Sequence, residues 1–535
     1  MKKYLTILAA MMASATFCVN AQNINASVQV TNSYSSSVGD FSKRALEVNV
    51  PDSALRFDYE FDYSVFDSPY RGAYEFTPYA VKVIPEPQGY QGRNLYVKAG
   101  AGYPVYPVLQ AVVATKPREN FAMSVYQDLQ GYYGQYWAVS PSDMKVVKEM
   151  YEGYDISEKF GIEGSWRNEA LQASWDVDYR GLYNSDSRLP STYHSGGVKA
   201  NFRSVNGGPS YFLYDVTLSG RVGADVLDHY FEPVNVMQQS YALDATFGPV
   251  IKGAYRILVD VNARHDTYSG ISAGRTTALQ AYPRAEFLFG RFNISAGARL
   301  SYIRSFRIHP EIDLSLSLLN GAVDIYAGLT GGQHLNSYME FKETYHRFNI
   351  SYTDDVSSVT NDKFDVFAGV RGHIGGFFQY DLKGGYALLD NVPMAAVARV
   401  PAFLTTIAYK DFNLIYADAS LSWKSERVDA SAGVHFRKTS LGMPEDCFDL
   451  PMFSGDVSFT YNFRKRIYAG VTCEGSTSRG DIAAYADLGV YGEYRFTDRF
   501  SVWAKGGNLL DMAIQRIPRY VESGINFTAG ITLNL

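Results

Sequence analysis

The residues best suited to chemistry in this sequence are aspartates and arginines that occupy every second position of otherwise apolar runs. In ALQASWDVDYR, Asp176, Asp178 and Arg180 alternate with Val177 and Tyr179, so charged and apolar side chains point to opposite faces of an extended chain. The charged candidates of this kind are Asp176, Asp178, Arg180, Asp244, Arg256, Asp260, Arg264, Arg299 and Asp313. Such a face forms either an internal network of salt bridges and hydrogen bonds or a polar lining for a small polar or charged solute. Its mixed signs argue against a strongly ion-selective pore.

Patterns for catalysis and metal binding are weak by comparison. The stretch GISAG matches the nucleophile pattern around Ser272, but that pattern requires a strand, a turn and a helix, whereas this stretch falls in a loop between two strands. The eight histidines are spread singly, without a HExxH motif. The acidic stretch YTDDVSSVTNDKFD offers oxygens to a cation but is more typical of a solvated loop, and there is no phosphate-binding Gly-Lys-Ser/Thr loop. We therefore predict no enzyme, no cofactor and no metal site.

The elements that position the charged residues are predicted to be β-strands, because apolar and polar residues alternate with a period of two. The clearest example is GINFTAGITLNL, in which Ile525 and Leu535 begin and end an apolar face that is opposed by polar or small residues. A soluble sheet shows this pattern with its apolar side toward a core. A membrane β-barrel shows it inverted, with the apolar side toward lipid and the polar side toward a wet lumen.

Composition favours the membrane barrel. Aromatic residues make up 15% of the chain, with 42 Tyr and 32 Phe, and such rings suit the two membrane interfaces. A charged face in run after run suits a lumen better than a soluble sandwich. Apart from the first residues, no stretch approaches the 18 apolar residues of a membrane-spanning helix. The net charge of -6 argues against nucleic acid as a partner.

The N-terminal part divides into two segments before the barrel. Residues 1–21 have two lysines, a short apolar run and a small-residue end, which predicts a secretory signal peptide. Residues 22–93 contain polar, aromatic-acidic and proline-rich stretches, which predict an extended periplasmic segment or abbreviated plug. The transmembrane β-barrel is predicted over residues 94–535. Of the two remaining cysteines, Cys473 is expected to face lipid, whereas Cys447 lies in a loop.

The connections predict an all-β, antiparallel transmembrane barrel of about 22 strands, within a range of about 18–24. Very short turns such as IKG, IGG and RKR alternate with longer loops, among them 131–154 and 332–361, and residues 391–410 are also expected outside the strands. In outer-membrane barrels the short turns are periplasmic and the long loops extracellular. An even strand count then places both ends of the barrel on the periplasmic side.

Two stretches carry a resemblance to a known family. YRFTDRFSVWAKGGNLLD followed by GINFTAGITLNL resembles the last strands of TonB-dependent receptors, in which an Asn-Leu pair, here Asn508-Leu509, precedes a loop. RNLYVKAGAGYPVYPVLQAVVATKPRENFAMSVYQ is similar to the first strands of TonB-dependent receptor-like outer-membrane barrels of the Bacteroidota. The sequence departs from the family in two ways. Full receptors carry a larger plug domain and an energy-coupling box before the barrel, whereas here only residues 22–93 lie between the predicted signal peptide and the barrel. The final residue is Leu535 rather than the usual Phe or Tyr.

Two functions remain open at this stage. The first is a receptor-like barrel in the outer membrane that binds or passes a solute. The second is a non-conducting accessory or structural barrel that anchors an outer-membrane or surface complex. The expected partners are the lipid bilayer, the barrel-assembly machinery and a periplasmic or outer-membrane protein. The acidic and aromatic strip Phe57 to Phe66 is expected to dock either in the lumen or on such a partner.

Overall fold

The computed structural model describes residues 94–115, 120–140, 145–185, 190–205, 210–227, 234–270, 274–319, 322–344, 346, 358–397, 405–442, 449–518 and 520–535. Ser272, Cys447 and the whole of the predicted signal peptide and N-terminal segment lie outside these residues. The predictions made for them therefore stay predictions.

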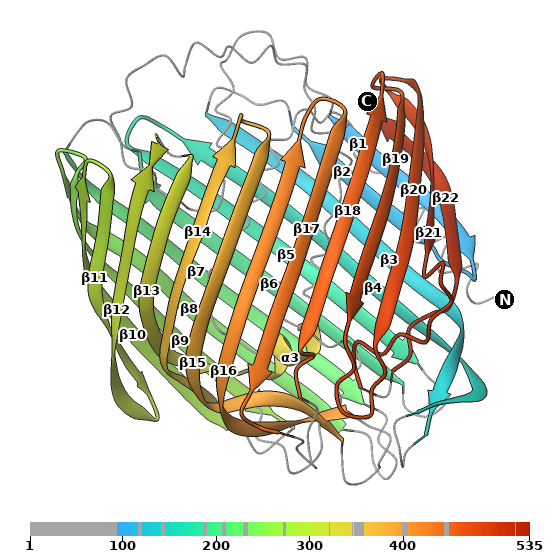
Figure 1. Cartoon of the computed structure of the whole chain (residues 1–535), viewed down its shortest axis with the longest axis horizontal. Helices are drawn as coiled ribbons and strands as arrows, with labels where there is room; N and C mark the ends of the chain where they lie inside the picture. The colour runs from blue at the N-terminus through green and yellow to red at the C-terminus, as the bar shows by residue number, and fades with distance from the viewer. Residues whose placement is uncertain are drawn as a thin grey trace.

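The described residues form 22 strands and one short helix (Figure 1). The strands are β1 Leu95–Tyr103, β2 Val108–Ala114, β3 Phe121–Val139, β4 Val146–Arg167, β5 Leu171–Ser185, β6 Ser191–Ser204, β7 Tyr211–Leu227, β8 Val234–Ile251, β9 Tyr255–Ser269, β10 Arg275–Phe289, β11 Phe292–Ile303, β12 Ser305–Leu318, β13 Val323–Leu335, β14 Val359–Ile374, β15 Phe378–Val397, β16 Thr405–Lys424, β17 Val428–Thr439, β18 Phe453–Phe463, β19 Ile467–Ser476, β20 Tyr485–Thr497, β21 Phe500–Gly507 and β22 Asn526–Asn534. The helix, α3, spans Tyr338–Thr344. No helix in this part of the chain is long and apolar enough to cross a membrane.

The strands close into one antiparallel barrel. Each strand pairs with its neighbours in sequence, and β1 pairs with β22 from Tyr96↔Asn534 to Tyr103↔Phe527. The amide of Leu535 also donates to the carbonyl of Leu95 at 2.8 Å. Closure leaves no unpaired sheet edge, as a spanning β-structure in lipid requires. The predicted fold class and strand number are confirmed.

Short turns gather at one end of the barrel, the upper edge of Figure 1, where the C-terminus also lies. Residues in several of these turns adopt the left-handed backbone that tight hairpins need: φ is 51° at Lys252 and 68° at Gly253, between β8 and β9. At the opposite end, the loop end, the longest connections lie, such as those between β13 and β14 and between β21 and β22, although Arg304 alone joins β11 to β12. The predicted alternation of short turns and longer loops is thus present in the described strands.

The outer surface is apolar and carries an aromatic band near each end. Val198, Ile257 and Val457 are each more than 50% exposed, which is expected of side chains that face lipid rather than water. Exposed aromatic residues near the short turns are Phe289, Phe292, Phe377, Trp423, Phe463 and Phe496, and those near the loop end are Tyr103, Tyr302, Phe306, Phe453 and Phe527. Cys473 is exposed on β19, on the same face as the apolar residues Ile467 and Val471, as expected. The fold implies an outer-membrane location.

Two predicted loops are instead strands that extend beyond the length a membrane requires. The expected loop 131–154 is wrong, because β3 and β4 contain 19 and 22 residues and remain paired to Val139↔Val146. About 9 to 11 residues suffice to cross a bilayer. Tyrosine pairs stabilise the extension, since the rings of Tyr136 and Tyr151 stack with centroids 5.6 Å apart.

Residues 391–410 were also expected outside the strands, and this prediction is wrong for most of them. Strands β15 and β16 have 20 residues each and continue past a bulge between Leu389 and Val392. Val392, Met394 and Phe412 are buried in an apolar cluster that this hairpin forms with Leu450. Burial of apolar surface therefore holds a strand pair together where the sequence pattern indicates a loop.

Candidate functional site: the lumen at the loop end

All nine charged candidates lie on the inner face of the barrel wall. Along β5, Val177 is 45% exposed on the outer face, so Asp176, Asp178 and Arg180 point to the lumen. The same parity places Asp244, Arg256, Asp260, Arg264, Arg299 and Asp313 inward from β8, β9, β11 and β12. Whether a solute touches these residues stays a prediction.

Most of these charges have partners within the protein. Six of the nine form ion pairs: Asp178–Arg221, Arg180–Glu343, Arg256–Glu286, Asp260–Arg284, Arg264–Glu340 and Arg299–Glu311. Asp176 and Asp244 accept hydrogen bonds from the Tyr126 hydroxyl and the Asn262 amide. Four of the six pairs join neighbouring or next-nearest wall strands. The other two, Arg180–Glu343 and Arg264–Glu340, connect the wall to helix α3.

Helix α3 lies in the connection between β13 and β14, within the predicted loop 332–361, and it folds into the barrel (Figure 1). Ser337 caps its first turn, because its hydroxyl accepts from the Glu340 amide at 3.3 Å and its carbonyl accepts from the Phe341 amide at 3.1 Å. The Ser337-x-x-Glu340 spacing is that of a capping box. This spacing is a sequence signal for a short helix within the stretch 332–361, for which only a loop was predicted.

Five consecutive wall strands, β5 to β9, hold α3 from the lumen side. Lys342, which has no exposed side-chain surface, forms an ion pair with Asp225 of β7 at 3.0 Å and donates to the Ser191 hydroxyl at 2.6 Å. The Tyr338 hydroxyl also donates to Asp225. An ammonium and a carboxylate buried together require this kind of mutual satisfaction.

The two glutamates of α3 bind arginines on either side of that buried pair. Glu343 pairs with Arg180 of β5 at 2.9 Å, and Glu340 pairs with Arg264 of β9 at 2.6 Å. His334, at the end of β13, lies 3.4 Å from the other Glu340 oxygen. Glu340 and Glu343 are three residues apart and lie on the same side of the helix. Their carboxylates contact the first and the last of the five strands, β9 through Glu340 and β5 through Glu343.

An apolar contact completes this seat for α3. Met339 packs against Leu182 and Tyr193, and all three side chains are buried. Gly223 provides the room: a Cβ atom at this position would lie 2.7 Å from the Met339 sulfur. The amide of Met339 donates to the Gln238 side chain at 2.9 Å. We call the surface formed by Arg180, Leu182, Tyr193, Ser195, Gly223, Asp225, Gln238 and Arg264 the α3 seat.

The charge state of Glu340 follows from these contacts. Burial within the barrel disfavours its carboxylate, but Arg264 and His334 outweigh this effect and lower the pKa of Glu340 to about 2. Although the barrel encloses it, 41% of its side-chain surface remains accessible. Glu340 is therefore ionised at any pH at which the protein would work.

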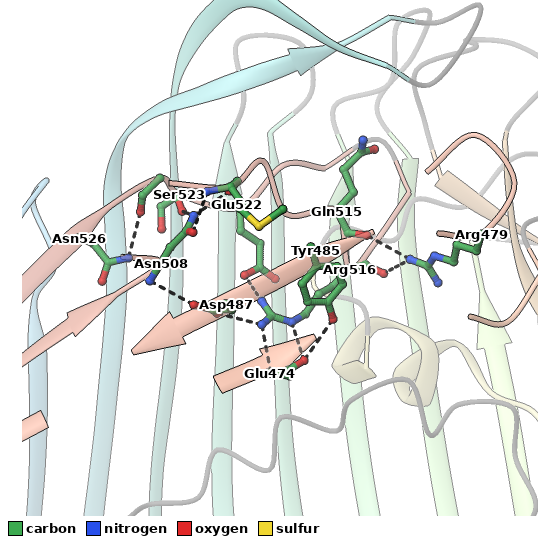
Figure 2. Close-up of polar contacts among 12 residues, drawn as sticks. Glu474, Arg479, Tyr485, Asp487, Asn508, Gln515, Arg516, Glu522, Ser523 and Asn526 are labelled. Atoms are coloured by element: carbon green, nitrogen blue, oxygen red, sulfur yellow. Dashed lines mark hydrogen bonds and ion pairs between the residues drawn. The ribbon is translucent and has the colours of Figure 1, made fainter. Parts of the chain in front are cut away.

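The loop between β21 and β22 forms a second polar cluster at the same end of the barrel. Figure 2 shows Arg516 surrounded by three carboxylates from β19, β20 and the loop itself. Arg516 contacts Glu474 and Asp487, each at 3.0 Å, and also pairs with Glu522. Its side chain is only 8% exposed, so the ion pairs are well shielded. Arg479 adds hydrogen bonds to loop carbonyls, including that of Gln515 at 3.2 Å.

Asn508, the first residue of the Asn-Leu pair, organises the start of that loop (Figure 2). Its side-chain amide donates to the carbonyls of Met512 at 2.8 Å and Ser523 at 3.2 Å, while its side-chain oxygen accepts from the Met512 amide at 3.0 Å. Its φ is 45°, a left-handed conformation that asparagine tolerates better than most residues. The Asn-Leu pair thus has a structural reason to precede the loop.

No metal site emerges from the described residues, among which no three or more His, Cys, Asp or Glu side chains gather as ligands. Several of the histidines that lie on strands contact protein groups. His194 contacts Tyr179 at 2.7 Å, His309 contacts Asn361 at 3.2 Å and His435 contacts Asp418 at 2.6 Å. The absence of metal chemistry in the whole chain stays a prediction.

Comparison with known proteins adds information about the fold. No family model and no curated sequence matches this chain. Among solved structures, the chain resembles the ferric enterobactin receptor PfeA of Pseudomonas aeruginosa, with a TM-score of 0.60 and 10% identity over 83% of this chain and 80% of the other. The FrpB iron transporter of Neisseria meningitidis gives 0.61 and 10% over 83% and 81%. The copper transporter OprC gives 0.59 and 11% over 84% and 81%. The chain shares its barrel fold with receptors and transporters of iron and copper.

Proposed function

We propose that this barrel binds a polar solute and passes it across the outer membrane through its lumen, which α3 narrows at the loop end. The observation that carries this proposal is the inward position of α3. A barrel that only anchors other proteins has no need to seat a loop helix on five strands of its inner wall. The iron and copper transporters that share the fold support transport as the function.

The finer assignment is a TonB-dependent receptor-like protein with an abbreviated plug. It rests on the Asn508-Leu509 pair and the first-strand resemblance, together with the shared barrel fold. In this proposal, residues 22–93 close the periplasmic end, where the short turns lie, and the loops face the exterior. The barrel-assembly machinery would insert the protein, as for other barrels of this class.

A non-conducting accessory barrel is the second candidate. One observation favours it: six of the nine charged wall residues pair with other residues of the protein, which is the arrangement expected of a filled, static lumen. The extended β15–β16 hairpin would then serve as a surface for another protein.

Planar-bilayer conductance separates these functions. The full chain would be compared with a variant that lacks residues 22–93, each refolded and purified in the same detergent. We expect the full chain to be closed or nearly so and the truncated barrel to conduct. If both barrels are closed, although both are folded, the accessory role replaces transport.

A further inference from the structure

Four donors from three wall strands converge on the carboxylate of Glu343. Arg180 of β5 donates to one oxygen at 2.9 Å. Tyr193 and Ser195 of β6 donate to the other oxygen at 3.2 and 3.3 Å, and Arg221 of β7 lies 3.6 Å from it. Both carboxylate oxygens are thus satisfied by groups that are fixed on β-strands. We call these four residues the carboxylate cradle.

The cradle is held in place by the wall itself. Arg221 donates to both oxygens of Asp178 at 2.6 and 2.7 Å and to the Ser195 hydroxyl at 3.2 Å, none of which belongs to α3. Arg180 and Ser195 are directly opposed residues of paired strands. The two arginines and Asp178 together carry one net positive charge, which Glu343 neutralises. If Glu343 moved away, an oriented set of anion-binding donors would remain in the lumen.

We propose that the carboxylate cradle is a binding site for a carboxylate-bearing solute, and that Glu343 occupies it when the solute is absent. This inference rests on the proposed function, whose solute class it specifies. The solute displaces Glu343 by presenting the same two oxygens to the same four donors. Binding at the wall therefore removes one of the contacts that seat the helix.

Displacement of Glu343 weakens the hold on α3 without removing it. The helix keeps the Glu340–Arg264 and Lys342–Asp225 pairs and the packing of Met339, but it loses the bonds from Arg180, Tyr193 and Ser195. A helix of seven residues has little stability of its own and depends on such contacts. With fewer contacts, the helix leaves its seat more often, and Lys342, whose side chain is fully buried while α3 is seated, is then exposed for more of the time.

Citrate, a tricarboxylate, is a suitable probe. Its binding to the full chain in detergent would be measured by calorimetric titration at fixed ionic strength, with a titration of choline chloride as the control for nonspecific salt effects. Glu343→Gln removes the carboxylate that occupies the cradle when no solute is bound. Citrate then no longer has to displace charge-assisted hydrogen bonds, and its binding is expected to tighten about tenfold or more. Arg180→Gln removes the strongest donor and is expected to abolish binding. Glu152→Gln, at an exposed position of β4 near the loop end, is the matched control and should bind as the wild type does.

The second readout is acylation of Lys342, followed by mass spectrometry. Citrate should increase its labelling in the wild type and not in Arg180→Gln. Equal affinities of the wild type and Glu343→Gln, binding that persists in Arg180→Gln, or no binding by any of these proteins would each overturn the inference. Neither readout requires conduction. A barrel that binds citrate but never conducts would therefore refute the proposed function and leave the cradle in place.

Discussion

Val177 and Asp178 are consecutive residues of β5 that face different media. Val177 is exposed on the apolar outer surface, whereas Asp178 binds Arg221 in the lumen. Arginine at a lipid-facing position near mid-bilayer costs roughly 2 to 4 kcal/mol. We predict that Val177→Arg impairs assembly of the barrel, measured as the heat-modifiable folded fraction on a gel, and that Asp178→Asn does not. Equal tolerance of the two changes would contradict the assignment of the faces.

Glu340 gives a prediction for the dependence on pH. Its pKa of about 2 lies below the usual value of 4.5, so its bond to Arg264 helps to seat α3 at every pH above about 4.5. This contribution is lost as the pH falls through about 2, where the folded-state carboxylate takes up a proton. Amide exchange of residues 338–344 should therefore be slower in the wild type than in Glu340→Gln at pH 6, and the difference should vanish toward pH 2. A difference that persists at pH 2 would show that the ion pair is not its cause.

For a single residue, the sequence predicts which face of the strand its side chain occupies but not its partner. The alternation in ALQASWDVDYR is local, so it reveals that Asp178 and Arg180 share a face. Their partners are distant in sequence: Arg221 is 43 residues from Asp178, and Glu343 is 163 residues from Arg180. Only closure of the barrel and insertion of α3 bring these groups together.

The fit of α3 to its seat depends on Gly223. A larger side chain at this position would occupy the space of the Met339 sulfur, so Gly223→Val should unseat the helix and raise acylation of Lys342 severalfold. Gly220 lies on the same strand but faces outward, and a Cβ atom there would meet only Tyr241, at 3.5 Å. Gly220→Val is the control and should leave the labelling unchanged. If both variants label as the wild type does, Met339 does not anchor the helix.

The β21–β22 loop depends in a similar way on Arg516. Removal of this guanidinium would leave Glu474, Asp487 and Glu522 close together without their counter-charge, a change that typically costs roughly 3 to 5 kcal/mol for a buried pair. We predict that Arg516→Gln makes the loop sensitive to protease, with cleavage between 508 and 525 detected by mass spectrometry. Arg499→Gln, in an exposed short turn, is the control. Resistance of both variants would mean that Asn508 and Arg479 hold the loop without the Arg516 ion pairs.

The strands were predictable because each carries a repeating two-residue pattern that lipid on one side and polar groups on the other impose on the sequence. The extension of β3 and β4 was not predictable. Beyond the membrane, at the loop end, both faces of these strands carry tyrosines and glycines, so the alternation of apolar and polar residues fades. Helix α3 was missed for a different reason. Seven residues are too few for a helical period, and its stability comes from wall residues more than 70 positions away.

At the scale of the whole molecule, we propose that the lumen of the closed barrel is the path of a solute. Strand closure, an apolar outer surface with aromatic bands and an inner wall lined with charge are the features that separate inside from outside. Bands of exposed aromatic residues near both ends indicate where the membrane surfaces lie. Helix α3 lies against the inner wall at the loop end.

Thiol blocking of the conductance tests this claim most directly. Val198 and Lys199 are adjacent exposed residues of β6 that point to lipid and to the lumen, respectively. Each would be replaced by cysteine in a barrel that lacks residues 22–93 and carries Cys447→Ser and Cys473→Ser, and would then be treated with a bulky thiol reagent in a planar bilayer. We predict that the reagent lowers the conductance of Lys199→Cys and leaves that of Val198→Cys unchanged. Conductance that is unaffected in Lys199→Cys, with the modification verified by mass spectrometry, would contradict a path through the lumen.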